Sequence, residues 1–122
     1  MPNVIKLYGI PNCSTVKKAR DWLDSHHVVY DFHDFKKQGV TAELLTSWLA
    51  QIPREQLINR AGLTWRGLES SVKEAVVDNA SALALMQAKT SLIKRPLLEK
   101  DSKIIALGFN ETAYVKLLSC KE

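Results

Sequence analysis

The order of apolar patterns in the first 35 residues restricts the fold more than any other feature of this chain. Residues 4–10 (VIKLYGI) are rich in β-branched and aromatic side chains, which predicts a buried strand. From Ser14 onward the apolar residues recur at helical spacing. Residues 28–35 (VVYDFHDF) then alternate aromatic with polar side chains, which predicts a second strand with one buried face. Two strands joined by a helix in this way are expected to be parallel, with a right-handed crossover.

The rest of the chain predicts a largely helical stretch, then a hairpin and a last helix. The further helices are expected at residues 41–50, 54–62, 79–89 and 110–119. Thr41 and Asn110 stand at cap positions, and Gly62 is expected to end the helix that precedes it. Residues 36–39 are expected to form a polar turn. Two short apolar runs, PLLEK and KIIALG, predict a hairpin.

This order of elements predicts an α/β fold. Without the inserted helices the elements run β-α-β-β-α, which is the core of a thioredoxin-like domain with a mixed four-stranded sheet. The helical insertion falls between the second and third strands, at about residues 40–90. A length of 122 residues fits one domain, so residues 1–122 are expected to fold together.

Composition excludes several classes of function. The hydrophobic fraction of 46% and the charged fraction of 25% are typical of a globular protein. No apolar run approaches the roughly 18 residues that span a membrane, and the N-terminus has no signal-peptide pattern. With only two cysteines and no export signal, the reducing cytoplasm is the expected location. The net charge of +4 is spread along the chain, so no nucleic-acid partner is expected. The histidines, cysteines and acidic residues lack metal-ligand spacing, and neither a metal nor a bound cofactor is expected.

Cys13 stands where the first strand gives way to the first helix. A thiol reacts as its thiolate, which helix N-termini and nearby cations favour. Lys17 follows one turn later on the same helix face. The residue three positions after the cysteine is Val16, so this motif cannot close a Cys-x-x-Cys disulfide. Two interpretations stay open: a nucleophile whose sulfur is resolved by another molecule, or a small apolar residue at a strand–helix junction.

A pair of basic residues, Lys94 and Arg95, precedes Pro96. A cis X-Pro bond costs only about 0.5–1 kcal/mol over the trans form, and in a thioredoxin-like core such a turn lies beside the reactive cysteine. Arg95 could then present a planar guanidinium to an oxyanion or a carboxylate. The alternative is a solvated basic pair before an edge strand. Arg60, at the end of its expected helix, could be a charge that complements the helix dipole.

Four segments together resemble the arsenate reductase-like (ArsC/Spx-like) family, in particular its small YffB-type branch. The segments are LYGIPNCSTVKKARDWL, LINRAGLTWRGL, ASALALMQAKTSLIKRPLL and LGFNETAY. The resemblance covers nearly the whole chain and implies a thioredoxin-like fold with a helical insertion. It implies Cys13 as the nucleophile, with Lys17 where arsenate reductases commonly carry arginine. It further implies a set of residues that bind the anionic substrate: Asn12, Thr15, Arg60, Lys94, Arg95 and Pro96.

The resemblance implies a cytoplasmic thiol/disulfide oxidoreductase. Its cysteine forms a mixed disulfide that glutathione resolves, so glutathione is the expected co-substrate and glutaredoxin a further expected partner. The alternatives are an arsenate reductase and a non-enzymatic, Spx-like regulator that binds RNA polymerase. Spx-type relatives switch through a Cys-x-x-Cys disulfide, and Val16 removes that switch here.

One position departs from the pattern of glutathione-coupled arsenate reductases. These enzymes have a further arginine before the last helix, where this chain has Gly108. Loss of a guanidinium removes both a charge and a fork of hydrogen-bond donors from an oxyanion site. Arsenate is therefore expected to be a poor substrate. Cys120, close to the C-terminus, is expected to be an inert thiol.

Overall fold

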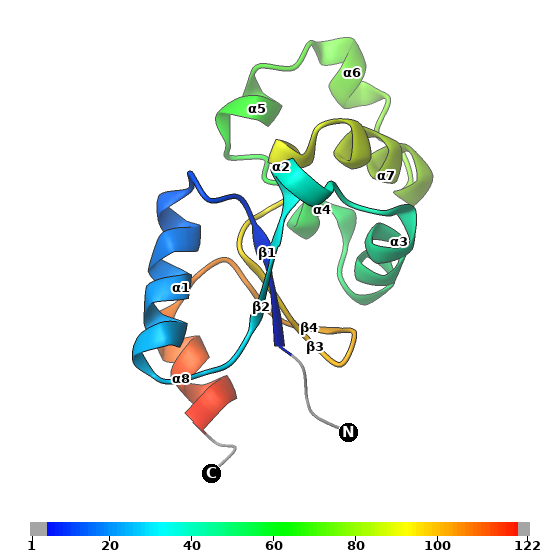
Figure 1. Cartoon of the computed structure of the whole chain (residues 1–122). Coiled ribbons are helices and arrows are strands. Elements are labelled where there is room, and N and C mark those ends of the chain that lie inside the picture. Colours follow the sequence, from blue (N-terminus) through cyan, green and yellow to red (C-terminus); the bar gives the residue numbers. More distant parts are fainter. Residues whose placement is uncertain (1–4, 120–122) are drawn as a thin grey trace. The chain divides into compact units, whose positions relative to one another are not determined.

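Four strands form one mixed sheet in the order β2-β1-β3-β4 (Figure 1). In the computed structural model, which describes the backbone of residues 5–119 and the side chains of residues 5–116, β1 (Ile5–Gly9) runs parallel to β2 (Asp31–Asp34). It runs antiparallel to β3 (Leu97–Lys100), and β4 (Lys103–Leu107) completes the hairpin with β3. The predicted thioredoxin-like α/β fold with a mixed four-stranded sheet is confirmed.

One face of this sheet packs against α1 (Ser14–Ser25) and α8 (Glu111–Ser119). Leu7 of β1 pairs with Leu98 of β3, and both side chains are fully buried. Val16 and Leu23 of α1 join the same core at helical spacing. Tyr114 of α8 is also fully buried there. The apolar side chains whose spacing predicted β1 and α1 are thus the ones that pack these two elements together.

Two predicted elements are wrong. The expected polar turn at residues 36–39 is instead a short helix, α2 (Phe35–Gln38), because Phe35 is buried and the Asp34 side chain accepts the N–H of Lys36 at 2.9 Å. The expected helix at 54–62 ends early, as α4 (Arg54–Leu57).

The reason for the early end of α4 is a pairing with a distant part of the chain. Ile58 forms an isolated antiparallel bridge with Ile93, and both side chains are buried. This bridge requires extended backbone directly after Leu57. Gly62 does not end a helix but caps the next one, α5 (Leu63–Arg66). Arg60 therefore lies in a turn and not at a helix C-terminus.

Residues Gly39–Lys94 form a compact unit with its own core, and the sheet with α1, α2 and α8 forms the other unit, Met1–Gln38 with Arg95–Glu122. The elements of the inserted unit not yet given are α3 (Ala42–Gln51), α6 (Ser70–Glu74), α7 (Asn79–Ala88) and the 3-10 turn η1 (Thr90–Leu92). Thr41 caps α3 as predicted, by accepting the N–H of Leu44. Trp48 and Met86 are fully buried and belong to the core of this unit.

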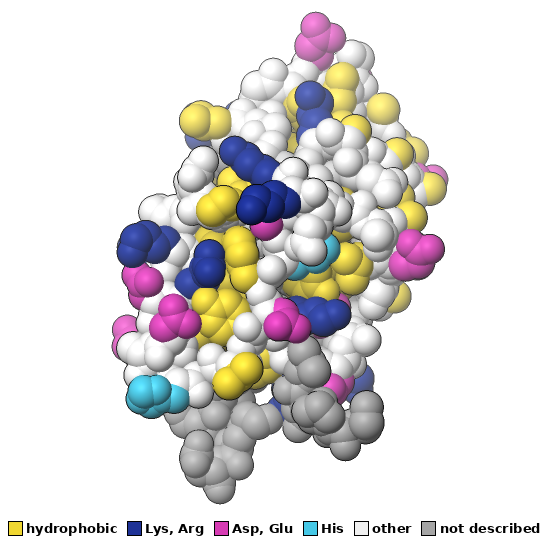
Figure 2. Space-filling model, viewed as in Figure 1, with side chains coloured by type: hydrophobic (Ala, Val, Ile, Leu, Met, Phe, Trp, Pro, Cys, Tyr) yellow, Lys and Arg dark blue, Asp and Glu magenta, His cyan; other side chains and the backbone are white. Residues whose placement is uncertain are grey.

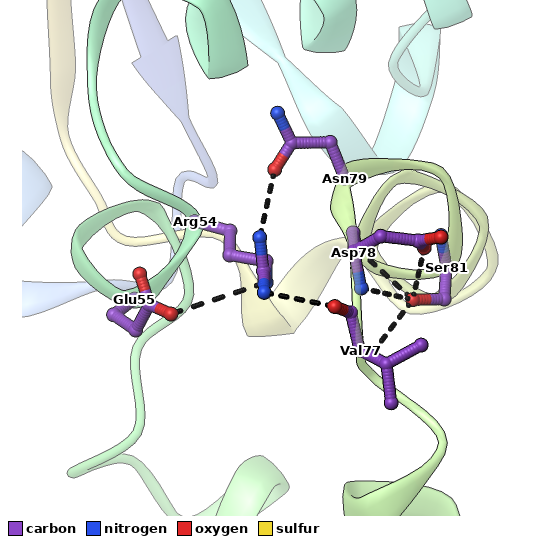
Figure 3. Close-up of polar contacts among 6 residues, drawn as sticks. All are labelled: Arg54, Glu55, Val77, Asp78, Asn79 and Ser81. Carbon is purple, nitrogen blue, oxygen red and sulfur yellow. Dashed lines mark hydrogen bonds and ion pairs between the residues drawn. The ribbon is translucent and has the colours of Figure 1, made fainter.

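The start of α7 is held by two sets of polar contacts (Figure 3). Asp78 and Ser81 cap the helix reciprocally, with the Ser81 N–H donating to the Asp78 carboxylate at 2.9 Å. Arg54 donates to the Val77 carbonyl at 2.9 Å and to the Asn79 side-chain oxygen at 3.3 Å. The Arg54 guanidinium thus makes hydrogen bonds within the inserted unit. Within residues 5–119, none of the helices combines the length and the apolar character needed to cross a membrane.

Candidate functional site

Cys13 is the N-cap residue of α1, and its side chain is partly exposed. Its backbone is extended (φ −111°, ψ 123°), and its carbonyl accepts the N–H of Lys17 at 2.9 Å, which closes the first helical turn. The backbone N–H groups of Thr15 and Val16 are the donors for the sulfur once it is a thiolate. A neutral thiol is a weak acceptor, so these N–H groups gain most when the sulfur is charged. The N-terminus of α1 therefore favours the reactive form of Cys13.

Arg95, which is 82 residues further along the chain, contacts the same sulfur. Its side chain donates a hydrogen bond to the Cys13 thiolate and adds a favourable charge. Arg95 lies two residues before the start of β3, and the Arg95–Pro96 peptide bond is cis, as predicted. The pairing of Tyr8 with Leu97 places this turn beside the end of β1, from which the chain continues to Cys13. The sheet register thus brings the two residues together.

The balance of these effects sets the pKa of the thiol. Burial raises the pKa of Cys13, because a charged sulfur is poorly solvated there. The hydrogen bond from the Val16 N–H, the contact with Arg95 and the hydrogen bond from the Thr15 N–H together outweigh it, and the pKa of Cys13 is lowered. A thiol with this environment is a better nucleophile near neutral pH than an ordinary cysteine.

Lys17 lies elsewhere. Its ammonium pairs with Asp21 at 2.9 Å, and both side chains are largely exposed. An exposed ion pair of this kind contributes about 0.3–0.5 kcal/mol on a helix. The structure therefore gives the role of the cation beside the sulfur to Arg95, whereas the sequence suggested Lys17. Asn12 is exposed in the turn before Cys13, and Thr15 is half-buried.

Val16 occupies the position of the second cysteine in a Cys-x-x-Cys motif. Its side chain is fully buried in the core. A Cβ atom on Gly9 would lie only 2.7 Å from one of its methyl groups, so this part of the core is tightly packed. Position 16 is therefore a structural position that also supplies a backbone donor to the sulfur.

Two further predicted anion ligands belong to the inserted unit. Arg60 is exposed, and its guanidinium lies over the ring of Trp65, 5.3 Å from the ring centre. The backbone N–H of Lys94 donates to the Leu57 carbonyl at 2.8 Å, and its side chain is exposed. Their binding of an anion at Cys13 stays a prediction. In the described part of the chain, His, Cys, Asp and Glu side chains form no group of three that could hold a metal ion.

The sequence singled out Gly108 only as the position of a missing arginine and not as a support of the Arg95 turn. Gly108 directly follows β4, and its N–H donates to the Pro96 carbonyl at 2.8 Å. Gly108 has a φ of 81°, in the region that favours glycine. The available signal was a glycine immediately after an apolar strand.

The comparisons with known proteins agree with this fold. The ArsC family model matches residues 8–117, which include the cysteine loop, the insertion and the Arg95 turn. This chain belongs to the ArsC family. A solved structure called YffB protein is 45% identical and covers 93% of this chain and 98% of its own, with a TM-score of 0.84. A solution structure from Brucella melitensis, called an arsenate reductase (ArsC) related protein, is 49% identical and covers 93% of this chain and 92% of its own, with a TM-score of 0.75.

Relatives with a regulatory name also match. The global transcriptional regulator Spx of Streptococcus mutans is 28% identical over 110 residues, which are 88% of this chain and 78% of the regulator. The proteins to which this chain is similar therefore include one called an arsenate reductase related protein and one called a transcriptional regulator. The resemblance to the ArsC/Spx-like family and its YffB-type branch is confirmed.

Proposed function

We propose that this ArsC-family protein is a glutathione-dependent thiol reductase in which Cys13 is the single catalytic thiol. The Cys13 thiolate attacks a substrate disulfide, whose sulfur–sulfur bond breaks; one sulfur leaves as a thiolate and the other stays on Cys13 as a mixed disulfide. A glutathione thiolate attacks that substrate sulfur and releases Cys13. A second glutathione reduces the resulting disulfide in solution, so two glutathione molecules are oxidised for each disulfide reduced.

The observation that carries this proposal is the environment of Cys13. The sulfur has two backbone donors and the Arg95 side chain, which together lower its pKa despite burial. The position that would resolve the intermediate within the motif holds the fully buried Val16. An activated thiol without a resolving partner in its motif needs an external thiol, and glutathione is the abundant one in a reducing compartment.

The carboxylates of glutathione supply the second part of the proposal. Arg95 offers a planar fork of donors next to the sulfur, the geometry that suits a carboxylate. The residues proposed to assist it are Asn12, Thr15, Arg60, Lys94 and Pro96. Lys17 is proposed to add only a weak long-range positive potential at the start of α1, because the Asp21 carboxylate that pairs with its ammonium offsets the charge.

Arsenate reduction is the second candidate, because the Brucella melitensis relative is called an arsenate reductase related protein. Gly108 weighs against it. Besides lacking a guanidinium, this position has a φ of 81°, which an arginine adopts only at a cost. Arsenate turnover coupled to glutathione and glutaredoxin is expected to be weak. Turnover as fast as with a disulfide substrate would place this candidate first.

A regulator that binds RNA polymerase is the third candidate, because of the similarity to Spx. The buried Val16 removes the Cys-x-x-Cys switch from this chain but not a binding surface. Co-purification of RNA polymerase together with no turnover of any disulfide would favour it.

The proposed setting is the cytoplasm, with glutathione and glutaredoxin as partners. Nucleic acid and membranes have no part in the proposal. On the face drawn in Figure 2, acidic side chains are interspersed among the lysines and arginines, whereas a nucleic-acid site calls for a continuous basic surface.

A coupled assay tests the proposal. Reduction of a mixed disulfide between glutathione and a small thiol is followed through oxidised glutathione production, with the full chain as catalyst. Cys13→Ser is expected to abolish the enzymatic rate, and Cys120→Ser is expected to retain it. A Cys13→Ser protein as active as the wild type, or a wild type no faster than glutathione alone, would overturn the proposal.

A further inference from the structure

A short chain of contacts leads from Gly108 to the Cys13 sulfur. The Gly108 N–H donates to the Pro96 carbonyl at 2.8 Å, directly beyond the Leu97–Leu107 pair of the β3–β4 hairpin. Pro96 is bonded to Arg95, whose side chain hydrogen-bonds the Cys13 thiolate. The loop that carries Arg95 is thus attached to the end of β4 through one backbone hydrogen bond.

We propose that Gly108 is a positioning residue that holds the Arg95 guanidinium against the Cys13 sulfur. The inference rests on the proposed roles of Cys13 and Arg95. It assigns to the β4–α8 connection a part in activating the thiol, although Gly108 itself carries no side chain that could touch a substrate.

The backbone conformation explains why glycine is needed. Gly108 has a φ of 81°, where residues with a Cβ atom are strained and β-branched residues most of all. A residue that relaxes to a negative φ turns its N–H away from the Pro96 carbonyl. Asparagine is one of the few residues with a side chain that adopt the left-handed region readily. Valine and asparagine therefore test the backbone requirement at similar volume.

The sulfur offers a direct readout of where Arg95 lies. The charged group that hydrogen-bonds it is Arg95, and the other donors are the N–H groups of Thr15 and Val16. Lys17 is paired with Asp21 on the exposed side of α1. If Arg95 moves away, the sulfur keeps only its two backbone donors, and its pKa rises while α1 stays unchanged.

The experiment measures the apparent pKa of Cys13 from the pH dependence of iodoacetamide alkylation, in full-length protein with Cys120→Ser so that one thiol reacts. Gly108→Val is expected to raise the pKa toward the value of Arg95→Ala, and Gly108→Asn to stay close to the parent. Gly39→Val is the matched control. Gly39 also has a positive φ, of 65°, but lies at the start of the inserted unit and not in the β4–α8 connection. It is expected to lower the melting temperature without raising the pKa of Cys13.

A double variant isolates the route through Arg95. In an Arg95→Ala background, Gly108→Val should leave the pKa of Cys13 unchanged, because the group that it positions is gone. If Gly108→Val does not fold, Gly108→Ala replaces it in the same set. An unchanged pKa in the Gly108 variants, or an equal shift with and without Arg95, would overturn the inference. Either result would leave the proposed function standing, provided that Arg95→Ala itself raises the pKa; an Arg95→Ala protein with the parent pKa would remove the site on which both rest.

Discussion

Arg95, in the turn before β3, hydrogen-bonds the thiolate of Cys13 at the N-cap of α1. This contact joins the two chain segments of the sheet unit, Met1–Gln38 and Arg95–Glu122, at one sulfur atom. It combines a charge-assisted hydrogen bond with the N–H groups of a helix N-terminus. The thiol is therefore activated by two independent elements of the fold.

The first prediction compares the two cations near Cys13. Arg95→Ala should raise the alkylation pKa of Cys13 clearly, because it removes a hydrogen bond and a charge next to the sulfur. Lys17→Ala should have a smaller effect, because the Lys17 ammonium is exposed and paired with Asp21. Parent Cys13 should titrate below the free-cysteine value of about 8.5. A larger effect of Lys17→Ala would return the role of cation to the residue that the sequence suggested.

The second prediction concerns stability and pH. The pKa of Cys13 is lower in the folded than in the unfolded chain, so deprotonation favours the fold. This stabilisation is fully present above the unfolded pKa of about 8.5 and is lost as the pH falls through the folded pKa. The free energy of unfolding of the wild type relative to Cys13→Ser should therefore increase as the pH rises from about 6 to about 9. A constant difference, measured by urea unfolding across this range, would contradict the lowered pKa.

The third prediction contrasts two buried phenols. The Tyr8 hydroxyl donates to the Glu99 carboxylate at 2.9 Å, and both side chains are buried. Tyr8→Phe removes a donor from a buried charged acceptor and should cost about 1–3 kcal/mol. The Tyr114 hydroxyl is buried and has no hydrogen-bond partner among the residues that the structure describes. Tyr114→Phe should be neutral or stabilising, because it removes an unsatisfied group.

The same two phenols predict alkaline instability. Burial raises the pKa of Tyr8 and of Tyr114, so the neutral form favours the fold. Their contribution is complete below the unfolded value of about 10 and declines as the pH rises above it. Tyr114→Phe should lose less stability than the wild type between pH 9 and pH 11, roughly the range around that value. Equal losses would show that Tyr114 titrates normally.

The fourth prediction tests the packing below the cysteine loop. Gly9→Ala places a Cβ atom 2.7 Å from a methyl group of the buried Val16. Overpacking of this kind should destabilise the chain by about 1–3 kcal/mol. The loss of stability in the Gly9→Ala, Val16→Ala double variant should be smaller than the sum of the losses in the two single variants, because the smaller side chain at position 16 leaves room for the added Cβ atom. A double variant whose two losses simply add would show that the clash is relieved in some other way.

Local patterns in the sequence predicted the elements that are defined by the apolar spacing and the caps of their own residues. The strand β1 and the helix α1 follow from the apolar spacing at Leu7, Val16 and Leu23, which are all fully buried. The helix caps at Thr41 and Asn110 are present, with their side chains accepting the N–H groups of Leu44 and Ala113. The place of Cys13 between strand and helix left two interpretations open, and the resemblance to the ArsC/Spx-like family favoured the nucleophile.

Pairings between distant segments account for what the sequence did not provide. The early end of α4 depends on the bridge between Ile58 and Ile93, which no local pattern in the sequence predicts. The sequence suggested Lys17 as the cation beside the sulfur, but the structure places Arg95 there, because β1 pairs with β3. Helical spacing alone placed Lys17 one turn from Cys13 but could not show that Asp21 would pair with its ammonium.

The reaction of the full-length protein with oxidised glutathione tests the central claim most directly. Intact-mass spectrometry and peptide mapping should find one glutathione per chain, on Cys13, because the motif holds Val16 where a resolving cysteine would stand. Cys120, which lies outside the described residues, should be dispensable, so Cys120→Ser should give the same adduct at nearly the same rate. Arg95→Ala should form it at least roughly tenfold more slowly, because a charge-assisted contact contributes about 1.5–3 kcal/mol. Rapid formation of an intramolecular disulfide between Cys13 and Cys120 in place of the adduct would contradict the single-thiol account.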